Sequence, residues 1–175
     1  MSTITYYFNS YIPAEAWTTH PEYMVDGNTN TYAGWETVNG KVQLLNTNTC
    51  TGTNLGTITK VEIRLWGMIT SGVSSFSLRP VFGGTLDGDV HNTGPMLVGT
   101  WSSYFNITSD TNAPATWNWS DIQNLNCDVI AVVVDGVVGA SKIEIQVTYT
   151  DGPAPQPTPT RTATARALIY HSRVS

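Results

Sequence analysis

Charged residues are scarce in this chain, as are the residue patterns on which most enzymes depend. Only 12% of its 175 residues are Asp, Glu, Lys or Arg, about half of the usual share of roughly 25%. Hydrophobic residues make up 41%, enough for one buried core, and the length is too short for two ordinary domains. The polar surface must therefore consist largely of Thr, Asn, Ser and Gly, a composition typical of extracellular and virion β-proteins.

Basic residues are too few to form a nucleic-acid-binding face. Residues 1–151 hold all 13 acidic residues and five basic ones, a balance of −8, whereas residues 152–175 hold three arginines and no acidic residue. Nucleic-acid binding requires a basic surface that displaces counterions, so the acidic body argues against it. No run approaches 18 apolar residues, so we expect no membrane span. The first residues also lack the basic and apolar regions of a signal peptide.

Catalytic and metal-binding motifs are nearly absent. The histidines, His20, His91 and His171, have no metal-ligand spacing. The chain also contains no nucleophile elbow and no glycine-rich phosphate loop. Asp87 and Asp89 lie close together and could act as a general acid and base, but a solvated or ion-binding turn is the favoured interpretation. We therefore expect that the protein is not an enzyme.

Cysteine is too rare for a disulfide framework. The chain has two cysteines, Cys50 and Cys127, and each follows a stretch rich in Asn or Thr. They could pair across two loops or remain as buried free thiols, and the sequence leaves both alternatives open.

Alternating apolar and polar residues predict β-strands throughout residues 1–151. Helix signals are nearly absent, apart from residues 119–125, where Ser120 could cap one short turn. Residues 56–67 and 142–149 alternate in the way expected of strands with one buried face. The continuous apolar run 129–134 is typical of a central strand covered on both sides. Together with the Gly-rich turns, these strands predict an antiparallel β-sandwich of jelly-roll or galactose-binding-like topology, in which the first and last strands pair.

The composition changes at the end of the predicted sandwich. Residues 152–164 are rich in Pro, Thr and Ala, which predicts an extended linker. Residues 165–175 form a C-terminal tail in which apolar residues return, among them Leu168, Ile169 and Tyr170. We expect these three to dock on a partner or a neighbouring subunit, for example by strand addition. The protein is then predicted to be a homo-oligomer or to bind other virion subunits.

Residues 24–35 contain the most specific local motif. Asp26, Gly27, Asn28 and Thr31 resemble the Asp-Gly-Asn-x-x-Thr loop that follows the first strand in discoidin-like, or galactose-binding-like, domains. The strand over residues 56–67 and the Glu-containing last strand are also similar to strands of that family. The resemblance extends loosely over the whole predicted sandwich.

The resemblance implies a structural calcium ion bound by Asp26, Asn28, Thr31 and Glu144. The chemistry is consistent with this, because calcium prefers hard oxygen ligands and a Gly-containing turn can direct carbonyl groups inward beside a carboxylate and a hydroxyl. Asp-Gly-Asn is also an ordinary turn sequence, so a loop without an ion is the alternative. The chain departs from the family in one respect, because its cysteines do not lie at the two ends of the domain.

Tryptophan is abundant, with six residues, most of them near predicted loops or strand ends. Exposed Trp rings stack on the apolar faces of sugars. Trp117 and Trp119 would share one face of an extended segment, and together with Trp35 they form a predicted glycan-binding site. For each of them, a place in the core or at a subunit interface is the alternative, because aromatic residues are frequent in both.

Two functions from different classes follow. The first is a non-catalytic structural or surface-binding module of an assembly, such as a decoration, tail or fibre protein of a phage virion. It is favoured by the missing signal peptide and by a tail suited to docking. The alternative is a carbohydrate-binding or adhesion module of an extracellular protein, favoured by the linker, the tryptophans and the discoidin-like loop. Both predict a location on a virion surface or outside the cell.

Overall fold

The computed structural model describes residues 1–13, 17, 19–70, 73–96 and 99–152. Its elements, in chain order, are β1 (Ser2–Tyr11), the 3₁₀ helix η1 (Pro21–Met24), β2 (Ala33–Glu36), β3 (Val42–Asn48), β4 (Gly56–Ile69), β5 (Ser75–Phe82), β6 (Leu86–Asp87), β7 (His91–Asn92), β8 (Thr100–Trp101), β9 (Phe105–Asn106), α1 (Trp119–Gln123), β10 (Asn126–Val132) and β11 (Val138–Asp151). Every strand pair among the described residues is antiparallel. The predicted all-β fold is confirmed.

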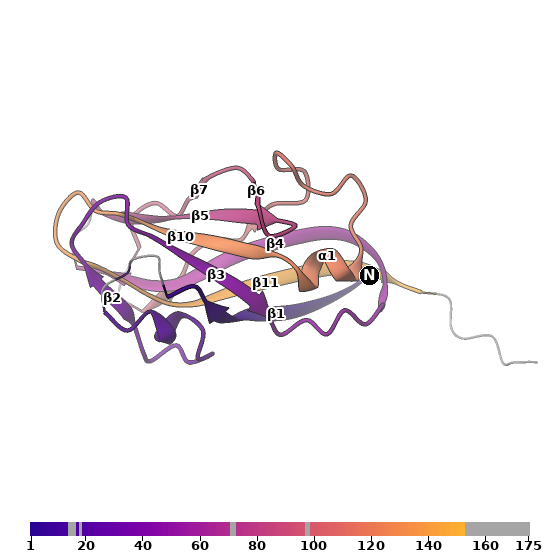
Figure 1. The fold of residues 1–175 in the computed structure, drawn as a ribbon, viewed down its shortest axis with the longest axis horizontal. Coiled ribbons are helices and arrows are strands. Elements are labelled where there is room, and N and C mark those ends of the chain that lie inside the picture. Colours follow the sequence, from indigo (N-terminus) through magenta and orange to yellow (C-terminus); the bar gives the residue numbers. More distant parts are fainter. Residues whose placement is uncertain (14–16, 18, 71–72, 97–98, 153–175) are drawn as a thin grey trace, which may run out of the picture.

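Strand β1 belongs to both layers of the structure. Its residues 2–7 pair with β11, and its residues 8–11 pair with β3. The first layer contains β1, β11 and β4, bordered by the short strands β2, β8 and β9. The second layer contains β1, β3, β10 and β5, bordered by β6 and β7. The two layers are thus one continuous sheet that folds over at β1 (Figure 1).

Alternation along the long strands decides which side chains enter the core. Ile63 and Leu65 of β4 are fully buried, as are Ile143 and Ile145 of β11. Arg64, which lies between the two buried β4 residues, points to the outer face of the first layer, where it pairs with a side chain of β11. The alternation of apolar and polar residues in the sequence therefore matches the alternation of buried and outward-facing side chains.

The apolar run 129–134 differs from its prediction. It does form a central strand, because β10 lies between β3 and β5. Val129 and Ala131 are fully buried, but β10 ends at Val132 and Val134 is 70% exposed. Ile130 and Val132, which point to the opposite face, are half-buried, so the run is covered more completely on one side, and its last residue extends into a loop.

The first and last strands pair, as predicted, so the start of β1 lies beside the end of β11. Ser2 stands opposite Tyr149, and the Ser2 hydroxyl donates a hydrogen bond to the Asp151 carboxylate, with 3.0 Å between Oγ and Oδ1. Figure 1 shows the N-terminus at the end of the sandwich where β11 finishes. Gly56, the first residue of β4, stands opposite Asp151 at the same end.

The only α-helix of the described residues is α1, close to where one short turn was predicted. The predicted cap, Ser120, is wrong, because the N-cap is Asn118. The Asn118 side chain accepts from the backbone N–H groups of Ser120 and Asp121, and the Asp121 carboxylate accepts from the Asn118 N–H. This reciprocal capping box fixes the start of the helix at Trp119.

The two cysteines are buried free thiols, so the second of the alternatives left open by the sequence is correct. Burial raises the pKa of the Cys127 thiol well above its ordinary value. A thiol in this state is a poor nucleophile and resists oxidation. Cys50 and Cys127 are therefore core residues.

Residues 153–175, which include most of the predicted linker and all of the tail, lie outside the described residues. The docking of Leu168, Ile169 and Tyr170 on a partner stays a prediction. Within the described part of the chain, none of the helices has the length and apolar character needed to cross a membrane.

We expect that Gly56→Ala will unfold the end of the sandwich. A β-carbon at Gly56, where φ is +141°, would lie 2.0 Å from the carbonyl oxygen of Thr150. This contact would separate β4 from β11, at an expected cost of about 3 kcal/mol in the free energy of unfolding. Gly40→Ala is the matched control, because Gly40 also has a positive φ, of +77°, but its β-carbon would meet nothing within 4 Å. This control substitution should lower the free energy of unfolding by only about 1 kcal/mol. Urea denaturation measures both values, and equal losses would contradict this account.

Candidate functional site

The predicted calcium loop is held by its own hydrogen bonds. The Asp26 carboxylate accepts from the Asn28 N–H, at 2.8 Å, and from the Thr31 hydroxyl, at 2.7 Å. The Asn28 side-chain oxygen accepts from the Asn30 N–H, at 3.0 Å. The loop docks on β11, where the Ser141 hydroxyl donates to the carbonyl oxygen of Asn28, at 2.7 Å. The structure therefore brings Asp26, Asn28 and Thr31 together, as predicted, in a closed turn.

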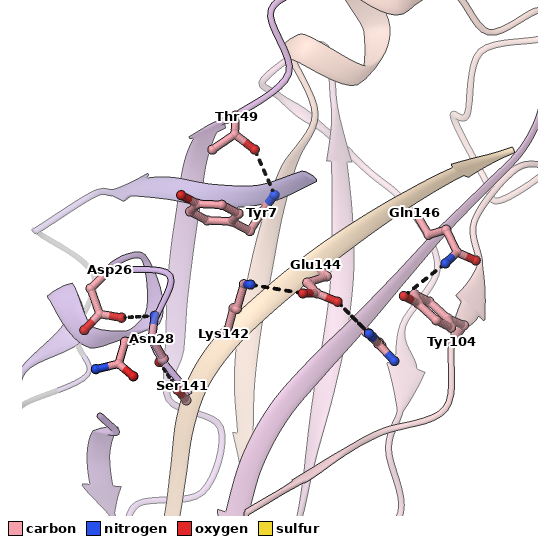
Figure 2. A network of polar contacts seen from close by, with 10 residues as sticks. Tyr7, Asp26, Asn28, Thr49, Tyr104, Ser141, Lys142, Glu144 and Gln146 are labelled. Carbon is pink, nitrogen blue, oxygen red and sulfur yellow. Dashed lines mark hydrogen bonds and ion pairs between the residues drawn. The ribbon is translucent and has the colours of Figure 1, made fainter. Parts of the chain in front are cut away.

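Glu144, the fourth predicted ligand, is not part of this loop. Its carboxylate lies on the outer face of the first layer, 2.7 Å from Nη2 of Arg64 and 3.1 Å from Nζ of Lys142. Figure 2 shows Asp26 and Asn28 apart from Glu144. Among the described residues, no group of three or more His, Cys, Asp or Glu side chains could hold a metal ion. Calcium binding stays a prediction. To act as a ligand, Glu144 would have to give up its ion pairs with Arg64 and Lys142.

The outer face of the first layer carries a network of charged and aromatic side chains. The Arg64 guanidinium lies 4.0 Å from the centre of the Trp101 ring and 4.3 Å from that of Tyr104. The side-chain amide of Gln146 donates to the Tyr104 hydroxyl, at 3.2 Å (Figure 2). Because these groups satisfy one another, the network serves to hold the β8–β9 segment on the sheet.

The predicted sugar platform at Trp117 and Trp119 does not form. The side chains are buried, with 7% and 4% of their surface exposed. The Trp117 Nε1–H donates to the carbonyl oxygen of Thr108, and the Trp119 Nε1–H donates to that of Gly56. The segment is not extended, because the Asn118 cap starts a helix between the two rings. The core alternative is correct for both. Trp35 lies in β2, and the placement of its side chain is outside the described part.

A polar groove crosses the outer face of the second layer. Its wide part has a volume of about 360 Å³ and is lined by Asn46, Thr47, Gly83, Gly84, Gln123, Asn124 and Asn126. Its narrow part has a volume of about 220 Å³ and is lined by Leu44, Arg79, Val81, Gly84, Thr85, Asp87 and Asp128. Gly84 lines both parts, so they adjoin.

Strand alternation and register place these side chains together. On β10, Cys127 and Val129 are buried in the core, so Asn126 and Asp128 point to the opposite face. Asp128 stands opposite Leu44 of β3 on one side and Arg79 of β5 on the other. The β5–β6 turn forms one wall of the groove, and it depends on glycine because φ is +56° at Gly83 and +81° at Gly84.

Asn46 has an unusual position in the wide part of the groove. Its side-chain oxygen is buried and has no hydrogen-bond partner among the described residues. A buried acceptor without a donor costs roughly 1–3 kcal/mol. The next residue, Thr47, has a φ of +50°, in the left-handed region that non-glycine residues rarely adopt. Unpaired polar atoms and strained backbone are both typical of binding sites.

The narrow part of the groove contains an ion triad, Arg79 with Asp87 and Asp128. Nε and Nη2 of Arg79 donate to the Asp128 carboxylate, and Nη1 lies 2.8 Å from Oδ2 of Asp87. Burial raises the pKa of Asp128, and the neighbouring guanidinium opposes that shift only in part. The Asp128 hydrogen bond in turn raises the pKa of Arg79. The triad has a net charge of −1 when all three groups are ionised.

This groove was not predicted from the sequence. Asp87 is its only member that the sequence singled out, and there as a possible acid or base. The available signals were the Asn-rich stretches at the end of β3 and around the start of β10, and the Gly-Gly turn after β5. No spacing rule connects these segments, because the β3–β10 and β10–β5 pairings alone bring them together.

Comparison with known proteins identifies no relative. No protein-family model matches the chain, and neither does a curated protein or a solved structure. The resemblance to discoidin-like domains therefore stays a prediction, and the function has to be inferred from the geometry.

We expect that Arg79→Met will destabilise the protein at neutral pH and that acid will reverse the loss. The substitution leaves the Asp128 carboxylate buried without its cation, which should cost about 2 kcal/mol, less than for a fully enclosed pair because water reaches Arg79. A carboxyl with a raised folded-state pKa stabilises the fold when it is protonated. The deficit relative to the wild type should therefore shrink as the pH falls through that pKa.

Denaturant titrations over a pH series measure this deficit. The double variant Arg79→Met with Asp128→Asn is the control, because it has no carboxyl at position 128, so the gain in stability that Arg79→Met shows with acid should be absent from it. A deficit in Arg79→Met that grows with acid would contradict the prediction.

Proposed function

We propose that this protein is a non-catalytic glycan-binding module and that the groove on the second layer is its binding site. The observation that carries the proposal is the buried, unpaired side-chain oxygen of Asn46 in a groove lined by carboxamides. Asn46 lines the groove, so a turn of its carboxamide would expose this oxygen to a sugar hydroxyl, which would supply the missing donor. This would convert an unfavourable feature of the free protein into binding energy.

The chemistry of the lining suits a polyhydroxylated ligand. A sugar hydroxyl both donates and accepts, and a carboxamide offers two donors and an acceptor on one flat group. Asn46, Gln123, Asn124 and Asn126 supply four carboxamides around the wide part. Its volume of about 360 Å³ is within the range of small-molecule sites.

The arrangement of Asp87 and Asp89 supports a binding function over a catalytic one. Asp87 pairs with Arg79, whereas the Asp89 carboxylate accepts from the backbone N–H of Thr111, at 3.2 Å. Hydrogen bonds from the Thr111 side chain and from its N–H lower the pKa of Asp89, which keeps it ionised. The two carboxylates thus have different partners, and neither is prepared as a general acid.

The assembly function predicted from the sequence, as a decoration, tail or fibre protein of a phage virion, depends on the tail beyond residue 152. The described residues contain no observation that favours it over glycan binding. A virion or extracellular location is compatible with the proposed site, because glycans are displayed on cell surfaces.

We expect the full chain to bind glycans on an array, and Asn46→Ala and Asn126→Ala each to weaken that binding by about tenfold, the value of one good hydrogen bond. Asn30→Ala is the matched control, because Asn30 is exposed on the Asp26 loop, away from the groove. Melting temperatures confirm that each variant is folded. Binding that survives both groove substitutions, or no binding to any glycan, would overturn the proposal.

A further inference from the structure

We infer that the groove selects uncharged glycans and rejects those that carry carboxylate or sulfate groups. This inference rests on the proposed function and concerns the class of ligand that the same site accepts. It is based on the charges along the groove and on the hydrogen bonds already made by its one cation.

Arg79, the only basic residue that lines the groove among the described residues, is already engaged with carboxylates. Asp128 accepts hydrogen bonds from Nε and Nη2, the two nitrogens that an arginine uses to bind a carboxylate side-on. Asp87 pairs with the remaining nitrogen, Nη1. An acidic sugar would have to displace one of these partners. The Asp128 side chain is only 6% exposed, so its displacement would break a contact inside the protein.

The local charge also opposes an anion. The triad carries two negative groups and one positive group, and the wide part of the groove has no ionisable lining residue to offset them. The acidic body of the chain, with 13 acidic and five basic residues over positions 1–151, adds to this repulsion at low salt.

A neutral sugar meets favourable groups at the same place. The Asp87 side chain is 54% exposed, so its carboxylate can accept hydrogen bonds from hydroxyl groups, and such bonds to a charged acceptor are strong. Leu44, which is half-buried, provides an apolar surface beside it for the carbon face of a ring. The narrow part thus continues the hydrogen-bonding surface of the wide part.

The test compares neutral polysaccharides with the same polysaccharides after sulfation, or after oxidation of their primary alcohols to carboxylates. We expect the wild type to bind the neutral form at least tenfold more tightly at low salt. Asp87→Asn should reduce this preference several-fold, because it removes one negative charge and frees Nη1 of Arg79. Asp89→Asn is the control, since it makes the same change in net charge at a carboxylate that hydrogen-bonds to Thr111 and does not line the groove.

The possible outcomes separate this inference from the proposed function. Acidic glycans that bind as tightly as neutral ones, and lose binding in Asn46→Ala, would overturn the selectivity and leave the glycan site in place. An equal effect of Asp87→Asn and Asp89→Asn would also overturn it, because selectivity would then come from net charge alone. The absence of binding to every glycan would overturn the proposed function, and the inference with it.

Discussion

The change of partner within β1 is the constraint on which the rest of the structure depends. Its first half is hydrogen-bonded to β11 and its second half to β3, so one strand fixes how the two layers face each other. Phe8, the first residue after the change, is fully buried where the layers diverge. The alignment of β3 is set from this point, and with it the alignment of β10 and β5 across the groove.

The two outer faces of the sandwich use polar residues in opposite ways. On the first layer, Arg64 and Lys142 both pair with Glu144, and aromatic rings cover the guanidinium. On the second layer, glycines and carboxamides leave a groove in which Asn46 keeps an unpaired acceptor. A face whose groups satisfy one another has little to offer a ligand. This contrast is the physical reason for placing the proposed binding site on the second layer.

Local chemistry could be predicted from the sequence, and long-range pairing could not. The alternation along β4 and β11 identified their buried faces, and the Asp26 loop closes as its turn sequence indicates. Glu144 was expected beside the Asp26 loop, but it pairs with Lys142 of its own strand and with Arg64, which stands opposite it through a β4–β11 register that alternation does not fix. Trp117 and Trp119 were expected on one face of an extended segment, but the Asn118 cap turned that segment into a helix. The groove was missed because long-range strand pairing forms it, from residues of β3, β5, β6 and β10.

The antiparallel pairing of the first and last strands has a mechanical consequence. Because Ser2 lies opposite Tyr149, the chain enters and leaves the sandwich at the same corner. Tension applied between these two points would break the hydrogen bonds between β1 and β11 one after another. It would not load all of them together. β1 would then separate from β11 at low force. If the protein were attached through one chain end alone, a pulling force on the molecule would not pass through the β1–β11 ladder.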